Sequence, residues 1–312
     1  MQEDVFSINS VARANLDLIA KEQSAVLEAR ACELSFIANE VAAKAIDLMS
    51  EGLSVLDFMS LLADQINELS SGRVVSSDVL PQSFLRSFLA SAEGVDAVLF
   101  VKLLAERLSE MGVIVSETDF LPPESSAQTF TYVRNALADE AYDVFSQDFD
   151  DPRVFYSPGF KEACVAVADG KCGYCILPFE ERGGVRVPII SDLASRLDLK
   201  ISAVTPVFGF EGTADMKYAL LKRGFVIPPR DEDTDRYLEL KLDFDTNIIS
   251  RLLPIAESLG ADLYRINTLG DFDGAFVSLI LRDRGEGFAP ILSYLTLFCN
   301  NYVPIGIYKN LE

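Results

Sequence analysis

Two arginines near the start of the chain are spaced so that one long predicted helix carries both. The helix is expected to begin near Ser10, and Arg13 and Arg30 lie on it seventeen positions apart. At 100° per residue this separation is about 1,700°, roughly 100° short of five turns, so the side chains lie on adjoining faces. An apolar series with the spacing of a packed stripe accompanies them: Leu16, Ile19, Val26, Leu27, Leu34, Ile37 and Val41. Arginines beside such a stripe usually extend their charged ends into solvent, and binding a ligand between them is the sharper alternative.

These positions resemble the first helix of the small all-helical chorismate mutases. That helix carries an Arg, apolar residues three and six positions on, an apolar pair, and a second Arg seventeen positions on. The resemblance implies that Arg13 and Arg30 hold the carboxylates of chorismate. The Lys that the family carries eleven positions further on is replaced by Val41, and GLSVLDFMSLLADQINEL, at the place of the second helix, has no basic residue. Weak binding is expected, because each missing charge-assisted contact contributes roughly 1.5–3 kcal/mol.

Redox and metal chemistry are restricted by the residue types that the chain lacks. It contains no His and no Trp, which excludes imidazole acid–base catalysis and His-containing metal sites. Cys172 and Cys175 form a C-x-x-C, but the apolar residues after them predict a strand rather than the helix of a thioredoxin-like site. Extended chain would separate their Cα atoms by roughly 10 Å, beyond the ~7 Å limit of a disulfide. We therefore expect small buried side chains here, with no metal and no cofactor.

A second resemblance lies in the middle of the chain. The segments VFYSPGFKEA, AVADGKCGYCILPFEE and SDLASRLDLKI are similar to prephenate dehydratase, in which a helix leads through a turn into a strand that ends in an ENS motif. The resemblance implies that Glu180 and Arg182 lie at the ligand pocket. It also matches Thr234 and Arg236 to the closing Thr-Arg-Phe motif, whose Thr is catalytic and whose Arg binds a carboxylate.

The departures from the dehydratase pattern fall at that site. The family's glycine-rich turn is replaced by Val133-Arg134-Asn135-Ala136-Leu137, and Asp235 separates Thr234 from Arg236. Between Glu180 and Arg236, the segment VTPVFGFEGTADMKYALLKRGFVI predicts one hairpin around Gly212, where the family builds a second lobe. Dehydration requires water exclusion and pre-positioned donors, which one hairpin does not supply. The plainer alternative is a small mixed domain that only packs its neighbours together.

The last region predicts a βαββαβ order of elements, the ferredoxin-like plan that ACT domains use. Strands are expected in DRYLELKLDF, ADLYRINTL, AFVSLILRD and VPIGIYKNL, with helices over 248–259 and 288–299. The ending Ile305-Gly306-Ile307-Tyr308 resembles the close of dehydratase ACT domains. The resemblance implies an aromatic amino acid held by Asn247 and Asn267, whose amides can hydrogen-bond its charged ends. An ACT domain kept for dimer contacts is the equal alternative.

Composition sets the remaining expectations. With 312 residues, 49% of them hydrophobic, the chain can form several cores, and we predict a multidomain α plus α/β protein. The expected domains are a helical chorismate-mutase-like domain at 1–120, a reduced prephenate-dehydratase-like α/β domain at 128–230 and an ACT-like domain at 235–312, with a linker at 121–126. The net charge of −21 disfavours nucleic acid and anionic membranes as partners. The acidic start and the lack of an apolar run near ~20 residues predict no membrane span, no signal peptide and a cytoplasmic location.

Two functional hypotheses follow from the order of these regions, which is that of the bifunctional chorismate mutase–prephenate dehydratases of phenylalanine biosynthesis. The first is a non-catalytic relative that binds an aromatic amino acid or a carboxylate metabolite, or regulates a pathway enzyme as its partner. The second is an active enzyme, a residual chorismate mutase or prephenate dehydratase, completed by groups from a partner subunit. A homodimer is expected in either case.

Overall fold

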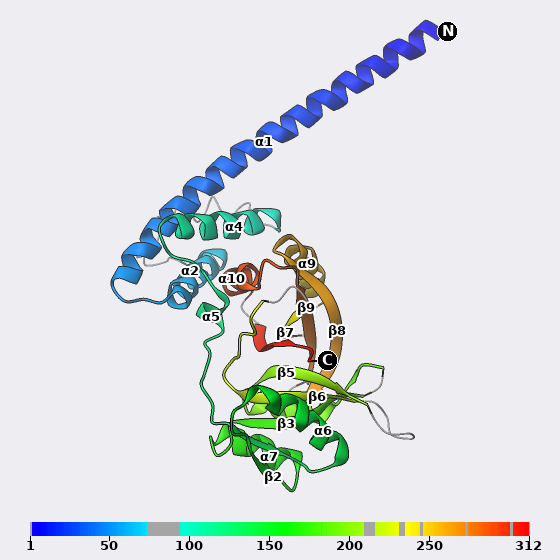
Figure 1. Ribbon diagram of the computed structural model, residues 1–312. Helices are drawn as coiled ribbons and strands as arrows, with labels where there is room; N and C mark the ends of the chain where they lie inside the picture. The colour runs from blue at the N-terminus through cyan, green and yellow to red at the C-terminus, as the bar shows by residue number, and fades with distance from the viewer. Residues whose placement is uncertain are drawn as a thin grey trace. The chain divides into compact units, whose positions relative to one another are not determined.

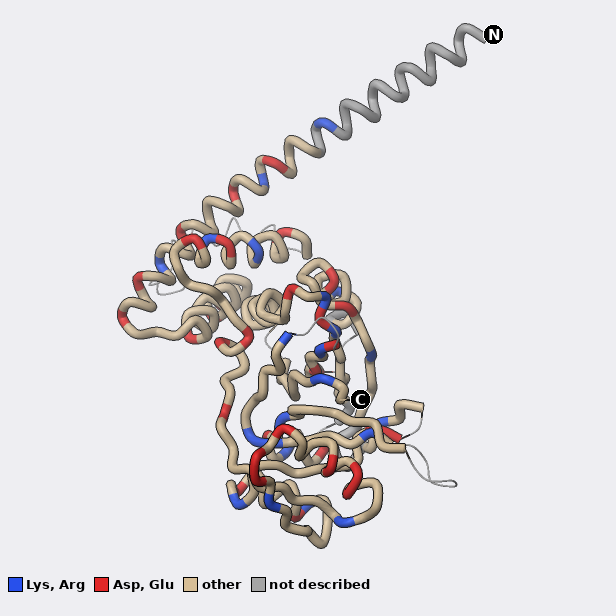
Figure 2. The backbone as a smooth tube through the Cα atoms, viewed as in Figure 1, with Lys and Arg blue, Asp and Glu red and all other residues tan. Residues whose placement is uncertain are grey.

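The computed structural model describes residues 2–73, 94–181, 183–208, 216–230, 235–243, 246–271, 274–299 and 302–311. Its internal contacts divide the chain into two compact units, Met1–Val115 and Ser116–Glu312. The described part of the first unit is helical, and every described strand belongs to the second unit (Figure 1). Acidic residues are spread along both units (Figure 2). None of the described helices combines the length and the apolar character needed to cross a membrane.

The first unit contains three described helices: α1 (Gln2–Ser50), α2 (Val55–Ser70) and α4 (Val95–Glu110). Ser54 and Asp57 form a reciprocal capping box that starts α2, so two of the free N–H groups at its beginning are satisfied. The helices predicted near 55–69 and 96–110 are confirmed, whereas the helix predicted at 82–92 lies outside the described residues. α1 begins at Gln2 rather than near Ser10, because residues 2–9 contain no Gly or Pro that would interrupt it.

Among the described side chains of the apolar stripe of α1, burial begins at Leu34. Leu34, Ile37 and Val41 are buried, as predicted, and they pack in the unit that α2 and α4 complete. Val26 and Leu27, predicted to belong to the same packed stripe, are instead 68% and 66% exposed. That prediction was wrong for this chain by itself, because the described residues of α2 and α4 do not cover α1 at those positions.

The second unit is built on one ten-stranded mixed sheet with the order β2-β1-β3-β6-β5-β10-β7-β9-β8, and β4 pairs with β3. β1 is parallel to β2 and β3, and β10 is parallel to β5, whereas the other pairs are antiparallel. The strands are β1 (Thr129–Tyr132), β2 (Arg153–Tyr156), β3 (Tyr174–Glu181), β4 (Val185–Arg186), β5 (Leu199–Val207), β6 (Met216–Arg223), β7 (Arg236–Asp243), β8 (Ala261–Asp271), β9 (Gly274–Asp283) and β10 (Tyr302–Lys309).

The helices of the second unit pack against this sheet or against one another. They are α5 (Glu117–Phe120), α6 (Ala136–Phe145), α7 (Phe160–Ala168), α8 (Pro188–Arg196), α9 (Thr246–Ser258) and α10 (Ala289–Phe298), with a 3₁₀ turn η1 at Ser146–Asp148. α6 packs on one core with Phe130, Tyr132 and Tyr174. α7 and α8 pack on a second core that also includes Tyr237, Ile280 and Tyr308 from β7, β9 and β10. Strands from β3 to β9 in the sheet order therefore contribute to one hydrophobic core.

β10 joins the two parts of the sheet, and Gly306 permits this junction. Gly306 pairs with Ile201 of β5 on one side and with Glu239 of β7 on the other. A Cβ atom at position 306 would lie 2.5 Å from the backbone oxygen of Ile201, so a larger residue would force the strands apart. Residues 128–230 and 235–312, predicted as two domains, thus share one sheet, and their description as separate domains stays a prediction.

Several local expectations are confirmed. β5 and β6 form the predicted antiparallel hairpin, whose turn around Gly212 lies outside the described residues. From β7 to β10 the element order is the predicted βαββαβ, and the sheet order is β10-β7-β9-β8. The segment after Leu121 that was predicted as a linker lies beside the end of β6, where Pro123 bridges to Phe225 and Lys222 donates to the backbone oxygen of Glu124. Burial lowers the pKa of the Lys222 amine.

Candidate functional site

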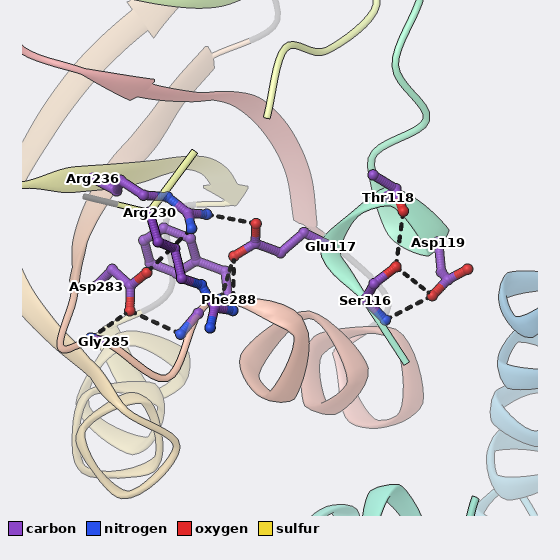
Figure 3. Close-up of polar contacts among 10 residues, drawn as sticks. Ser116, Glu117, Thr118, Asp119, Arg230, Arg236, Asp283, Gly285 and Phe288 are labelled. Carbon is purple, nitrogen blue, oxygen red and sulfur yellow. Dashed lines mark hydrogen bonds and ion pairs between the residues drawn. The ribbon is translucent and has the colours of Figure 1, made fainter. Parts of the chain in front are cut away.

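Arg236, the residue matched to the carboxylate-binding arginine of the dehydratases, is the first residue of β7 and is only 3% exposed. Its guanidinium lies between two carboxylates of this same chain (Figure 3). Nη2 donates to Glu117 Oε2 at 2.5 Å, and Nη1 lies 3.5 Å from Asp283 Oδ2. Charge-assisted contacts of this kind are strong in a buried setting, so the planar donor edge of Arg236 is already in use.

Glu117 is placed by a short helix. Ser116 and Asp119 form a reciprocal capping box, which fixes Glu117 as the first residue of α5. Its second oxygen, Oε1, accepts from the backbone N–H of Phe288 at 2.8 Å, and Arg230 Nη2 lies 4.0 Å away. Phe288 is the N-cap of α10, so the carboxylate also lies at the positive end of that helix.

Asp283 fixes the opposite side of the cluster. Its Oδ1 accepts from the backbone N–H groups of Gly285 and Gly287 at 2.8 and 2.9 Å. Gly287 has a φ of 83°, and a Cβ atom there would lie 1.8 Å from Arg230 Nη2, so only glycine fits without displacement. The turn from β9 into α10 therefore holds Asp283, and Asp283 in turn holds Arg236.

Glu180 and a neighbouring arginine form a second buried cluster. Glu180 Oε1 accepts from Arg265 Nη1 at 2.9 Å and lies 3.3 Å from Arg186 Nε. Arg186 Nη2 donates to Glu239 Oε2 at 2.6 Å, and the Arg186 guanidinium lies 3.4 Å from the centre of the Phe179 ring. Thus Glu180, predicted as a ligand-binding residue, is bound within the protein's own charge network.

Glu239 is the second carboxylate of this network and is fully hydrogen-bonded. Ser278 Oγ donates to its Oε1 at 2.7 Å, and the Tyr308 hydroxyl donates to its Oε2 at 3.1 Å. Burial, and next the Glu239 charge, raise the pKa of Tyr308 well above its ordinary value. Tyr308 belongs to the ending that resembles an ACT domain, and here its hydroxyl ties β10 to β7 through this carboxylate.

Arg30, matched to the second arginine of the mutases, is also paired inside its own unit. Its Nε donates to Asp96 Oδ2 at 3.0 Å, and its Nη1 donates to Glu33. Arg13 lies in α1, but its side chain is outside the described part. The role of Arg13 and Arg30 in a mutase-like site therefore stays a prediction.

The remaining predicted site residues are only partly described. Thr234 and Arg182 lie outside the described residues, and so does the side chain of Asn247, which is in the first turn of α9. Asn267 is half-buried on β8, and its Nδ2 atom is buried without a hydrogen-bond partner among the described residues.

Cys172 and Cys175 are buried, as expected. Cys175 lies in β3, Cys172 lies just before it, and all five cysteines are free thiols. The Cys175 thiol contacts Cys164 of α7, and this contact, together with burial, raises the pKa of Cys175 well above its ordinary value. No group of three potential metal-ligating side chains occurs among the described residues.

Sequence reasoning missed Glu117, Asp283, Arg186, Glu239 and Arg265. The Ser-x-x-Asp pattern at Ser116 could have indicated the short helix that carries Glu117. Nothing local indicates the ion pair itself, because Glu117 and Arg236 are 119 positions apart in the sequence. Arg186 gives no signal either, since it lies in a two-residue strand.

Among the comparisons with known proteins, the one with solved structures finds proteins that are similar to this chain. No protein-family model matches the sequence, and no curated protein matches it. The X-ray structure of prephenate dehydratase from Streptococcus mutans is 15% identical, with a TM-score of 0.49 over 60% of this chain and 100% of that chain. A structure described as GqqA, a novel type of quorum quenching acylases, is 17% identical, with a TM-score of 0.44 over 59% of this chain and 95% of that chain.

A third solved structure is the prephenate dehydratase of Arthrobacter aurescens in complex with L-Phe. It is 12% identical, with a TM-score of 0.44 over 58% of this chain and 89% of that chain. The functional argument that follows rests on the residues of this chain.

Proposed function

We propose that this protein is a non-catalytic relative of the bifunctional chorismate mutase–prephenate dehydratases, and that it binds an aromatic amino acid or a carboxylate metabolite in phenylalanine metabolism. The observation that carries the proposal is the pairing of Arg236. A dehydratase needs this arginine free to hold the carboxylate of its substrate. Here Glu117 and Asp283 already neutralise Arg236, which is only 3% exposed. A substrate would have to displace a buried ion pair before it could bind.

Arg30 supports the same interpretation of the helical unit. Its Nε and Nη1 atoms point to Asp96 and Glu33, so two carboxylates of the protein stand where a chorismate carboxylate is expected in the mutases. The described residues of α2 carry no basic side chain that would supply a further cation. Mutase activity therefore requires rearranged ion pairs as well as added cations.

The binding role is assigned to the βαββαβ region. The free donor of Asn267 on β8 is suited to a carboxylate or carbonyl acceptor, and Asn247 is proposed as its companion at the start of α9. We further propose the ACT-like domain at 235–312, a cytoplasmic homodimer, and a pathway enzyme as a protein partner. In this scheme the ligand changes assembly or partner affinity instead of being converted.

Calorimetric titration tests the binding role. Phenylalanine, tyrosine, chorismate and prephenate are titrated separately into the purified full-length protein. A saturable heat with at least one of these compounds, reduced in Asn267→Ala, is the expected result. No heat with any of the four would remove the metabolite-binding role and leave a protein partner as the basis of function.

A further inference from the structure

We propose that residues 2–29 of α1 pair with the same residues of a second copy of the chain, so that each copy covers an apolar face that the other leaves exposed. These residues are the outer part of α1. The inference rests on the homodimer of the proposed function and specifies its interface. It starts from exposed apolar side chains that no described residue of the first unit covers.

The exposed side chains continue the face of α1 that is buried further along the helix. Leu27 precedes Leu34 by one heptad, so the two side chains lie within about 20° of one another around the helix axis. Leu34 is 0% exposed, whereas Leu27 is 66% and Val26 is 68% exposed. One apolar stripe therefore changes from buried to exposed between Leu34 and Leu27.

The change occurs where α4 begins. Asp96, in the first turn of α4, accepts from Arg30 Nε at 3.0 Å, so the start of α4 lies beside Arg30. Val95, the first residue of α4, is 76% exposed and adds a further apolar side chain at this point. Figure 1 shows α1 continuing from there toward the N-terminus. Among the described helices of this unit, the cover of α1 therefore ends near Arg30.

Length indicates which partner can cover the outer part of α1. Its apolar positions continue at helical spacing through Ile19, Leu16 and Ile8, so the stripe extends about 27 Å outward from Val26. The segment 82–92, which precedes α4 and is predicted from the sequence as a helix, would span only about 16 Å. A second copy of the chain supplies a helix of equal length, which can cover the whole stripe.

The outer part of α1 also has the pattern of a helix that pairs with its own kind. Its apolar positions recur at spacings of three and four, and charged residues of both signs, Lys21 and Glu28 among them, stand outside the stripe. A single helix that projects into water is marginally stable, because most helices in proteins depend on the packing of an apolar face. Two identical stripes can bury one another in a contact with two-fold symmetry.

Sedimentation equilibrium of the full-length protein tests the pairing. The wild type should be a dimer at micromolar concentration. Val26→Asp/Leu27→Asp places charges in the contact and removes two aliphatic side chains from each copy, so the dimer dissociation constant should rise at least about a hundredfold. The helical signal in far-ultraviolet circular dichroism should fall with dissociation, because the outer part of α1 loses its packing.

Two controls make the result specific. Ile114→Asp is the matched variant, because Ile114 is 78% exposed in the same unit but lies outside α1, and it should leave the dimer intact. Near-ultraviolet circular dichroism of tyrosine shows whether each variant keeps its second unit folded. All ten tyrosines lie in that unit and the chain has no Trp, so the signal reports on it alone.

A second measurement needs no change at the contact. A nitroxide label on the exposed Cys32 of the wild type should give an interchain dipolar distance within about 50 Å, because two overlapping outer parts place the labels no further apart. This measurement decides the question if Val26→Asp/Leu27→Asp does not fold. A dimer without such a distance would overturn the inference.

The other outcomes separate this interface from the proposed function. A dimer that Val26→Asp/Leu27→Asp leaves as tight as Ile114→Asp does would overturn the interface and leave the homodimer standing. A monomeric wild type would remove both the interface and the homodimer, and loss of stability in the double variant of such a monomer would assign the face to segment 82–92. Metabolite binding is measured by calorimetry and stands or fails independently of these results.

Discussion

Removal of the Arg186 guanidinium should be the most destabilising single charge change in the second unit. The Arg186 side chain is 2% exposed, and its two carboxylate partners, Glu180 and Glu239, are equally buried. Arg186→Leu leaves both without this cation in a medium of low polarity. Breaking a buried pair by removing one partner costs about 3–5 kcal/mol, because the remaining charge stays buried without compensation.

The remaining contacts place the ion-pair part of the loss near the lower end of that range, at about 3 kcal/mol. Glu239 keeps its hydrogen bonds from Ser278 and Tyr308, and Glu180 keeps Arg265. The contact of Arg186 with the Phe179 ring is lost as well, which adds about 0.5–2 kcal/mol. We therefore expect a loss of about 3–5 kcal/mol and a fall in the thermal midpoint of about 10 °C.

Urea unfolding, followed by the tyrosine signal of the second unit, measures this loss. Arg153→Leu is the matched control, because it is the same substitution in an exposed pair with Asp151 and should change the free energy of unfolding by no more than about 0.5 kcal/mol. The double variant Arg186→Leu/Glu239→Leu should recover part of the loss, since it removes one of the uncompensated charges. A loss for Arg186→Leu equal to that of Arg153→Leu would refute the reasoning.

Three further predictions concern other groups. Burial raises the pKa of Tyr237 and of Tyr294 to about 12. The two neutral phenols therefore stabilise the folded state below the unfolded pKa near 10, and this contribution is lost as the pH rises through about 12. Phenolate absorbance should develop at higher pH in the folded protein than in urea, and identical titration curves would contradict this. A thiol reagent should modify the exposed Cys32 rapidly in the folded protein and should reach the buried Cys164, Cys172 and Cys175 only after denaturation. Rapid modification of all five thiols in the native state would disprove the burial. Elemental analysis should find no stoichiometric zinc. Millimolar phenylalanine or tyrosine should raise the thermal midpoint by a few degrees at a hundredfold excess over Kd, and Asn267→Ala should abolish the rise; an unchanged shift in that variant would remove Asn267 from the site.

The sequence predicts those parts of the fold that depend on local pattern. The alternation on either side of Gly212 predicts the β5–β6 hairpin, and the run from Tyr237 to Tyr308 predicts the order of the last four strands and two helices. In Ile305-Gly306-Ile307-Tyr308, two residues serve the sheet and its buried charge network. Gly306 allows close approach to Ile201, and Tyr308 hydrogen-bonds Glu239.

Contacts between distant segments could not be predicted in this way. Glu117 and Arg236 are brought together by tertiary structure, and no periodicity in either segment depends on the other. The same limit explains Val26 and Leu27, whose spacing is that of a packed stripe although no described residue of the chain covers them. Pattern identifies apolar faces but does not tell which segment covers them.

The rate of phenylpyruvate formation from prephenate is the measurement that tests the central claim most directly. The full-length protein is assayed beside a protein-free control and a working prephenate dehydratase. Because Arg236 is paired with Glu117 and Asp283, the rate should equal that of the protein-free control. A rate above that control, lost in Arg236→Ala, would show that this arginine still serves a substrate and would contradict the non-catalytic role.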